Sequence, residues 1–318
     1  MGLEGSEQAT GLLDGGLWPF FLHQPESDGS MEEREPDNSW MNDPARNENR
    51  YAQLIEGSLF PPWTLFRESF REDHKLLLPR MIFLSMRTAR QIPRAVIMRA
   101  GKGRDAVVYR VLRSWGKRIC RLGQVRLSVM GAEKLDRNAT YLFAVNHMSP
   151  MDIPAIYAAL PVKAAFVANS IFRKIPVFSY WMRKSGAVFV EQGNPEMEMQ
   201  AFKDMLRRLK KKRSLILFPE GYIFQGEGLA DFKRGGLHAA VLTDTPIIPL
   251  CIYGTQHVIR AGSLHIVPRS RVIIEFGDPV LPSSLDRASR KDIERVIHDK
   301  LAAMKARHAS DWYGSRHR

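Results

Sequence analysis

The sequence predicts an α/β protein in which a mixed, mostly parallel central sheet is flanked by helices and preceded by an amphipathic helical N-terminal layer. After residue 122, short apolar segments alternate with longer segments of helical periodicity, which is typical of a sheet covered on both faces. Between residues 61 and 122, apolar clusters alternate with arginines in a helical pattern. The chain has 318 residues, 44% of them hydrophobic, and can bury a sizeable core. We therefore divide it into residues 1–60, 61–122 and 123–318.

The first 60 residues differ in charge from the rest of the chain. They carry twelve aspartates and glutamates against three arginines, a net charge of −9, which predicts an acidic, disordered tail. The remaining residues carry 44 lysines and arginines against 22 acids, a net charge of +22. Such a charge predicts an anionic partner: a membrane surface, a nucleic acid or a phosphate-bearing carrier. Charge alone does not choose among the three.

Residues 61–122 are predicted to be helical, and their arginines are spread along the segment. Two interpretations remain open at this point. Basic amphipathic helices lie in a membrane interface with their arginines toward anionic headgroups. The same pattern is also typical of a helical layer packed on a core. The arginines concerned are Arg80, Arg87, Arg90, Arg94 and Arg99.

The sheet and its covering helices are predicted from residue 123 onward. Strands are predicted at residues 125–129, 141–145, 164–168, 187–191, 214–218, 247–253 and 271–276. Helices are predicted near residues 154–160, 171–184, 195–212, 234–243 and 289–305. Asn194 and Pro195 predict the start of the third of these helices, and Ser289 with Asp292 predicts a capping box for the last.

No targeting or membrane-spanning segment is evident. The N-terminus is acidic, and its apolar cluster at residues 17–22 is too short for a secretory signal. Residues 141–162 lack lysine and arginine but include polar side chains and three prolines, which a spanning helix would not tolerate. Two cysteines, Cys120 and Cys251, are too few for a disulfide framework or a zinc site. We expect a cytoplasmic, peripheral membrane protein without a metal or cofactor.

A histidine and an aspartate five residues apart follow the predicted strand 141–145. His147 lies in a loop at a strand end, where α/β proteins place their chemistry, and Asp152 lies at the start of the next helix. A histidine there can take a proton from a hydroxyl near neutral pH, and a carboxylate can fix its tautomer. The alternative is that Ser149 and Asp152 form a capping box around Pro150. Pro154, which would fall inside the first turn of that helix, favours instead a helix with Asp152 itself as N-cap.

A second polar group follows the predicted strand 214–218. Glu220 and Gly221 end that strand, and Lys233 and Arg234 precede two glycines and a helix. Cations beside flexible backbone at a helix start suit a phosphate group. Farther along, the segment around Pro249 would pack beside the same sheet edge and line an acyl groove.

These motifs together resemble the glycerolipid acyltransferases typified by 1-acylglycerol-3-phosphate O-acyltransferase. Four blocks occur in that family's order within residues 120–255, and their order and spacing carry the resemblance. They are His-x-x-x-x-Asp at His147 and Asp152, Gly-x-x-Phe-Val at residues 186–190, Phe-Pro-Glu-Gly at residues 218–221 and Ile-Pro at residues 248–249.

The resemblance implies transfer of a fatty acyl group from acyl-CoA or acyl carrier protein to a hydroxyl of a lysolipid-type acceptor, in phospholipid biosynthesis at a membrane surface. It implies that His147 is the general base and that Asp152 orients it. Acceptor binding would fall to Glu220, Gly221, Lys233 and Arg234. A dyad without a protein nucleophile agrees with direct attack of the acceptor oxygen on the thioester.

The sequence departs from the family's pattern where basic residues are usual. Gln192 stands near an arginine position, Ile223 stands at another, and Asn169 replaces a lysine. Loss of bidentate donors weakens recognition of a phosphomonoester, so lysophosphatidate becomes a doubtful acceptor. Cations elsewhere in the domain offer compensation, namely Lys233, Arg234, Arg173, Lys174, Arg183 and Lys184.

Other classes of protein remain as alternatives. A non-catalytic membrane-surface lipid-binding protein on the same fold would explain the altered acceptor positions, although His147, Asp152 and Glu220 are intact. A nucleic-acid binder would explain the positive charge, but the sequence lacks the signatures of the usual modules, and we expect no nucleic acid as partner. A serine hydrolase would need a Gly-x-Ser-x-Gly elbow, which does not occur in the chain.

Overall fold

The structure, a computed structural model, describes residues 104–314 except residues 175, 227 and 260–265. The predicted acidic tail of residues 1–60 lies outside the described residues. The same holds for residues 61–103 of the predicted helical layer. Within the described part of the chain, no helix is long and apolar enough to cross a membrane.

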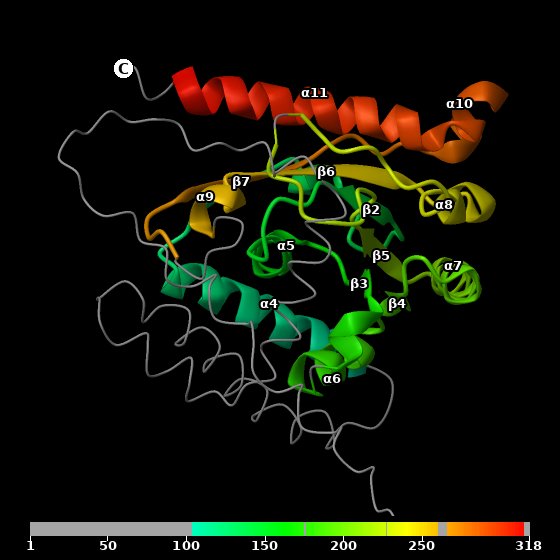
Figure 1. The fold of residues 1–318 in the computed structure, drawn as a ribbon, viewed down its shortest axis with the longest axis horizontal. Coiled ribbons are helices and arrows are strands. Elements are labelled where there is room, and N and C mark those ends of the chain that lie inside the picture. The colour runs from blue at the N-terminus through cyan, green and yellow to red at the C-terminus, as the bar shows by residue number, and fades with distance from the viewer. Residues whose placement is uncertain (1–103, 175, 227, 260–265, 315–318) are drawn as a thin grey trace, which may run out of the picture. The chain divides into compact units, whose positions relative to one another are not determined.

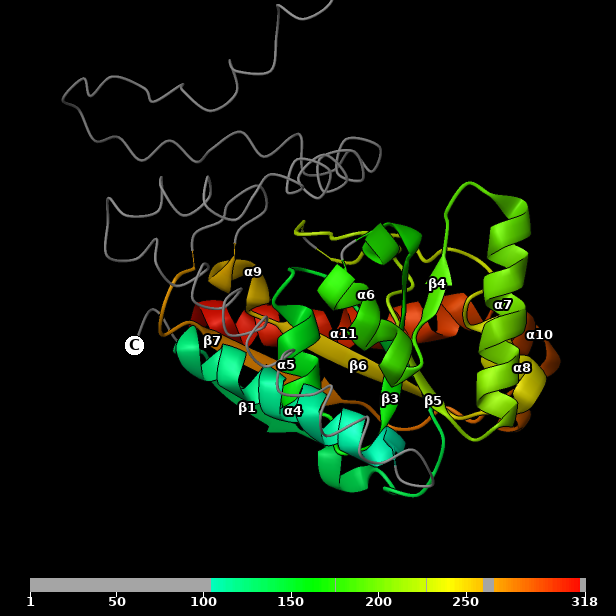
Figure 2. The same ribbon diagram turned by 90° about the horizontal axis from the view of Figure 1, so that it is seen from below.

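Seven strands form one sheet in the order β1-β7-β6-β2-β5-β3-β4 (Figures 1 and 2). All neighbouring pairs are parallel except β6 and β7, which are antiparallel. The prediction of a mixed, mostly parallel sheet is therefore confirmed. The strands are β1 (Arg126–Met130), β2 (Leu142–Val145), β3 (Ala164–Asn169), β4 (Val188–Val190), β5 (Ser214–Leu217), β6 (Ile247–Tyr253) and β7 (Arg271–Phe276).

Helices cover both faces of this sheet, as the strand pattern predicts. Alternate residues of the central strand show it: Phe143 and Val145 belong to the core beneath α4, α5 and α6, whereas Leu142 and Ala144 belong to the core beneath α7, α8 and α11 (Figure 1). The helices are α4 (Arg104–Leu122), α5 (Asp152–Ala159), α6 (Pro176–Ser185), α7 (Pro195–Lys210), α8 (His238–Thr243), α9 (Thr255–Val258), α10 (Arg287–Lys291) and α11 (Ile293–Gly314), with short 3-10 helices at Ala132–Lys134, Ser170–Lys174 and Pro282–Ser284.

Helix α4 packs against the core, so the packed-layer interpretation holds for residues 104–122. Val108 and Ile119 of this helix are buried. Gly116 allows the close approach to α5, because a Cβ atom there would lie 2.4 Å from the carbonyl oxygen of Pro154. The helix that precedes the sheet therefore braces the helix that begins at Asp152.

Three helix predictions need correction. The predicted helix 289–305 is two helices, α10 and α11. Asp286 caps α10, since its side chain accepts from the amides of Ala288 and Ser289. The predicted capping box of Ser289 and Asp292 is therefore wrong. Within the predicted helix 171–184, residues up to Lys174 belong to a 3-10 helix, and α6 begins at Pro176, a residue that suits the first position of a helix. Helix α8 begins at His238, four residues later than predicted, after a turn in which Gly235 has φ +99°.

The topology places β2 between β5 and β6, with which it runs parallel. The carboxyl ends of β2 and β5 therefore meet at one edge of the sheet. The loops that follow β2 and β5 carry the motifs around His147 and Glu220, so this edge of the sheet is the candidate site.

Candidate active site

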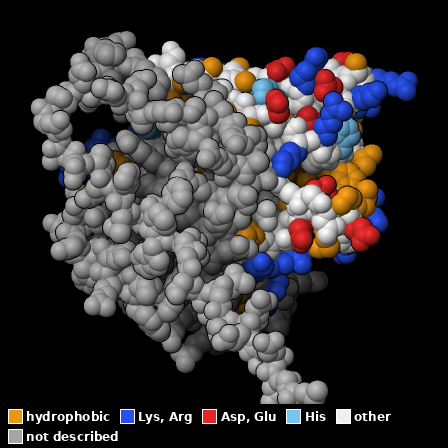
Figure 3. Space-filling view, in the orientation of Figure 1, with side chains coloured by type: hydrophobic (Ala, Val, Ile, Leu, Met, Phe, Trp, Pro, Cys, Tyr) orange, Lys and Arg blue, Asp and Glu red, His pale blue; other side chains and the backbone are white. Residues whose placement is uncertain are grey.

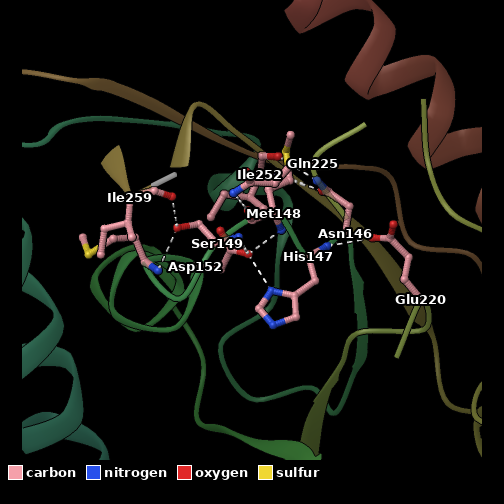
Figure 4. Close-up of polar contacts among 10 residues, drawn as sticks. Asn146, His147, Met148, Ser149, Asp152, Glu220, Gln225, Ile252 and Ile259 are labelled. Carbon is pink, nitrogen blue, oxygen red and sulfur yellow. Dashed lines mark hydrogen bonds and ion pairs between the residues drawn. The ribbon is translucent and has the colours of Figure 1, made fainter. Parts of the chain in front are cut away.

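His147 and Asp152 form a close pair at the carboxyl end of β2 (Figure 4). The Nδ1 atom of His147 lies 2.7 Å from Oδ2 of Asp152. The same oxygen accepts the amide hydrogens of Met148 at 2.8 Å and Ser149 at 3.0 Å. An oxygen with these donors is an acceptor, so Nδ1 carries the hydrogen and Nε2 keeps a lone pair. In Figure 4, Nε2 points away from the carboxylate and from the other residues drawn.

The capping interpretation and the pairing interpretation describe the same carboxylate. Helix α5 begins at Asp152, but its N-cap is Met151, so the expectation that Asp152 itself is the N-cap is wrong. The Asp152 carboxylate bonds to the amide of Ser149 as the acid of a capping box does. The Ser149 hydroxyl completes the turn by accepting from the amide of Met151 and donating to the carbonyl of Ile259. Asp152 is fully buried, and its Oδ1 atom has no hydrogen-bond partner among the described residues. Helix start and loop thus hold the acid rigidly beside the imidazole.

Aromatic rings hold the plane of the imidazole. The ring of Phe218 stacks on that of His147, with centroids 3.9 Å apart and an interplanar angle of 14°. The ring of Phe166 of β3 also stacks on that of Phe218, with centroids 5.7 Å apart. The imidazole remains partly open, because 16% of the His147 side chain is exposed. A ring fixed on one side and open at the edge suits a base that meets a substrate.

Glu220 supports the backbone of the histidine rather than facing an open site. Its Oε1 atom accepts the amide hydrogen of His147 at 2.7 Å, and its Oε2 atom accepts that of Ala230 at 3.0 Å. Burial raises the pKa of this carboxyl to about 7, although the two amide bonds and the positive charge of Lys305 oppose the shift. Its exposed fraction is 1%, so an acceptor held directly by this carboxylate finds no support in the geometry.

The loop that follows Glu220 bonds to the histidine loop at two further points. The amide of Phe224 donates to the carbonyl oxygen of His147 at 2.8 Å. The side chain of Gln225 donates to the carbonyl oxygen of Met148 at 2.6 Å (Figure 4). Both backbone polar groups of His147 are therefore satisfied by residues of this second loop.

Gly221, Lys233 and Gln192 form a separate contact group. The Nζ atom of Lys233 donates to the side-chain oxygen of Gln192 at 2.6 Å, and the Gln192 amide donates to the carbonyl of Gly221 at 3.1 Å. Gly221 has φ +81°, and a Cβ atom there would lie 2.7 Å from Cε of Lys233. Arg234 is exposed next to Lys233. Three of the residues predicted to bind the acceptor, Gly221, Lys233 and Arg234, therefore lie close together.

Two other positions singled out in the sequence lie apart from this group. Pro249 is buried in the middle of β6, level with Ala144 of β2, and its carbonyl accepts from the amide of Gly277. Pro249 therefore lies inside the sheet, and its place in an acyl groove stays a prediction. Asn169 is exposed at the end of β3, and its side chain accepts from the amide of Ile171, which makes a local turn.

Asn146 and Phe218 contribute to the site without having been predicted from the sequence. The buried Asn146 side chain donates to the carbonyl of Ile252 and accepts from its amide, both at 2.8 Å, and so ties the end of β2 to β6. A polar residue directly before His147 was the available signal for Asn146. Phe218 lies in the Phe-Pro-Glu-Gly block, but its stacking partner is 71 positions away in the chain.

Comparisons with known proteins agree on one kind of protein. The sequence model of the family described as Acyltransferase matches residues 126–253. A 1-acyl-sn-glycerol-3-phosphate acyltransferase of Limnanthes douglasii is 26% identical over 176 residues, which are 55% of this chain and 62% of the relative. The protein of that name from Escherichia coli is 30% identical over 174 residues, 52% of this chain and 68% of the relative.

A solved structure shows the same fold. The 1-acyl-sn-glycerophosphate acyltransferase of Thermotoga maritima superposes with a TM-score of 0.65, covering 72% of this chain and 93% of that protein at 24% sequence identity. The sequence matches, in contrast, span about three fifths of the length of the Limnanthes protein.

Proposed function

Because this chain belongs to the glycerolipid acyltransferase superfamily, we propose that it moves a fatty acyl group from a thioester donor, acyl-CoA or acyl carrier protein, to a hydroxyl of a lysolipid-type acceptor. The observation that carries the proposal is the 2.7 Å contact between His147 and the buried Asp152, which leaves Nε2 as the basic atom of the pair.

In this mechanism Nε2 of His147 removes the proton of the acceptor hydroxyl while its oxygen attacks the thioester carbonyl. The tetrahedral intermediate collapses, the carbon–sulfur bond breaks, and the imidazolium returns its proton to the leaving sulfur. Asp152 keeps the neutral imidazole in one tautomer and stabilises the imidazolium that forms. No acyl-enzyme forms, and Ser149 is not a nucleophile because its hydroxyl is bonded within the turn.

The acceptor side favours a headgroup other than a phosphomonoester. Gln192 and Ile223 stand where the family resemblance expects arginines. Gln192 uses its side-chain oxygen to hold Lys233, which leaves a lysine point charge in place of a guanidinium fork. We therefore propose that lysolipids without a terminal phosphate are acylated at least as fast as lysophosphatidate.

The positive net charge of residues 61–318 supports a site of action at an anionic membrane surface. In the part of the face that Figure 3 leaves uncovered, lysine and arginine side chains stand out around α10. Three basic residues of that helix are exposed, namely Arg287, Arg290 and Lys291. Basic groups near a surface each contribute about 1 kcal/mol to binding of anionic lipid.

An acceptor panel tests this function. Purified full-length protein is incubated with labelled oleoyl-CoA and, in separate reactions, with lysophosphatidate, lysophosphatidylglycerol, lysophosphatidylcholine and monoacylglycerol, and products are identified by mass. We expect acylated product from at least one acceptor other than lysophosphatidate. Product from lysophosphatidate alone would contradict the acceptor proposal, whereas binding of lipid vesicles without any product would favour the non-catalytic alternative.

A further inference from the structure

Lys305 is a buried cation on α11, the long helix that lies along one face of the sheet (Figure 1). Only 5% of this residue is exposed. Its ammonium group donates to the carbonyl oxygens of Gly226, at 3.2 Å, and Gly228. It also lies 5.6 Å from the centre of the Phe224 ring. A buried ammonium needs such partners, because removal of a charge from water is costly unless hydrogen bonds replace the lost hydration.

All three partners belong to the loop that holds His147. We call residues 220–226 and 228–230 the Glu220 loop. Its Phe224 amide bonds to the His147 carbonyl, and its Glu220 carboxylate bonds to the His147 amide. Lys305 is thus one step from the base: it holds the loop, and the loop holds both backbone groups of the histidine.

Charge supports the same connection. Burial lowers the pKa of the Lys305 ammonium, and the nearby Glu220 and Asp152 carboxylates favour its charged form. In return, Lys305 opposes the burial that raises the pKa of Glu220. The Lys305 ammonium therefore favours the ionised, accepting form of the Glu220 carboxylate.

We propose that Lys305 is a positioning residue that fixes the Glu220 loop and, through it, the histidine base; this inference rests on the proposed function. The ammonium group of Lys305 bonds to the Glu220 loop and not to the imidazole. Its removal should therefore slow the chemical step and leave binding of the acyl donor almost unchanged, because the loop would no longer hold His147 in one place.

The test compares the full-length variants Lys305→Met and Lys305→Gln with wild type. Met keeps the apolar stem without a donor, and Gln keeps donors without the charge. Lys300→Met, an exposed lysine on the same helix, is the control. We expect kcat to fall about tenfold or more in K305M, less in K305Q and not in K300M, with KM for oleoyl-CoA changed less than about twofold.

Hydrogen exchange gives a readout that does not depend on activity. In K305M the amides of Phe224 and Ala230 should exchange at least about tenfold faster than in wild type, while amides in the centre of β2 stay protected. Wild-type kcat and unchanged exchange in K305M would overturn the proposal. So would failure of both K305M and K305Q to fold, since Lys305 would then support the whole fold. If wild type acylates no acceptor, the proposed function fails, but exchange still decides whether Lys305 holds the loop.

Discussion

The two regions of the site differ in how their side chains are held. Around His147, the key bonds run from buried carboxylates to backbone amides, and both Asp152 and Glu220 are at most 1% exposed. Around Lys233, the key bond joins one side chain to another, and Lys233 is exposed. The residues around His147 are therefore held by buried bonds to the backbone, whereas Lys233 is held by a side-chain bond at the protein surface.

This difference separates the reaction from the choice of acceptor. A base held by backbone bonds cannot move without unfolding the loops that carry it, so the geometry of proton transfer comes with the fold. A surface lysine held by one glutamine can change its partner after a single substitution. We therefore expect changes of very different size from substitutions in the two regions.

The largest effect should come from His147→Ala. We expect kcat to fall about a thousandfold, because general-base catalysis is lost, while the melting temperature stays within a few degrees of wild type. Steady-state rates with labelled acyl-CoA and a thermal unfolding scan check both parts. A variant that keeps a tenth of wild-type activity would break the assignment of the base.

An intermediate effect should come from Glu220→Gln. The glutamine keeps one carbonyl oxygen but presents an NH2 group to the other amide, so the loop loses a bond and kcat should fall about tenfold. Lys233→Met, which removes an exposed charge, should change kcat much less. Equal losses in the two variants would erase the distinction between the regions.

Stability against pH checks the buried state of Glu220 independently. The folded-state pKa, about 7, is higher than the usual value of 4.5, so the folded protein binds this proton more tightly than the unfolded chain does. The stabilisation is present below pH 4.5 and is lost as pH rises toward 7. The free energy of unfolding of wild type should therefore fall, relative to that of E220Q, across this window in urea titrations. A constant difference would contradict the raised pKa.

The smallest effect should come from Gln192→Arg. An arginine here adds a bidentate donor near Lys233, so kcat/KM for lysophosphatidate should rise a few-fold relative to a phosphate-free lysolipid, with kcat for the latter unchanged. Competition of the two acceptors in one reaction, with products separated by mass, measures the ratio. A large change in kcat for both acceptors would mean that the acceptor side is not independent of the base.

The sequence predicts the strands well because buried parallel strands are short, apolar and bounded by turns. Each of the seven predicted strands is present in the structure within about three residues at either end. The antiparallel pairing of β6 and β7 could not be predicted in this way, because an apolar strand segment does not show in which direction it runs beside its neighbour. The boundary between α10 and α11 was also missed, because Ser289 and Asp292 match the capping-box pattern whereas the observed cap is Asp286.

The pair of His147 and Asp152 is predictable because both residues lie close in sequence at a strand end. The roles of Asn146, Phe218 and Lys305 depend on contacts with residues far away in the chain. In the sequence, Lys305 cannot be distinguished from the other polar residues of an amphipathic helix. Glu220 was assigned to the acceptor from its motif, whereas its burial, which the sequence does not reveal, supports a bond to the histidine backbone.

A double-variant cycle tests the central claim most directly, namely that His147 and Asp152 act as one unit. Values of kcat/KM are measured for wild type, His147→Ala, Asp152→Asn and the double variant. If Asp152 works only through the imidazole, its loss should not matter once His147 is gone, so the double variant should match H147A within about threefold. A double variant at least about tenfold slower than H147A would contradict the account, because Asp152 would then act on the reaction without the histidine.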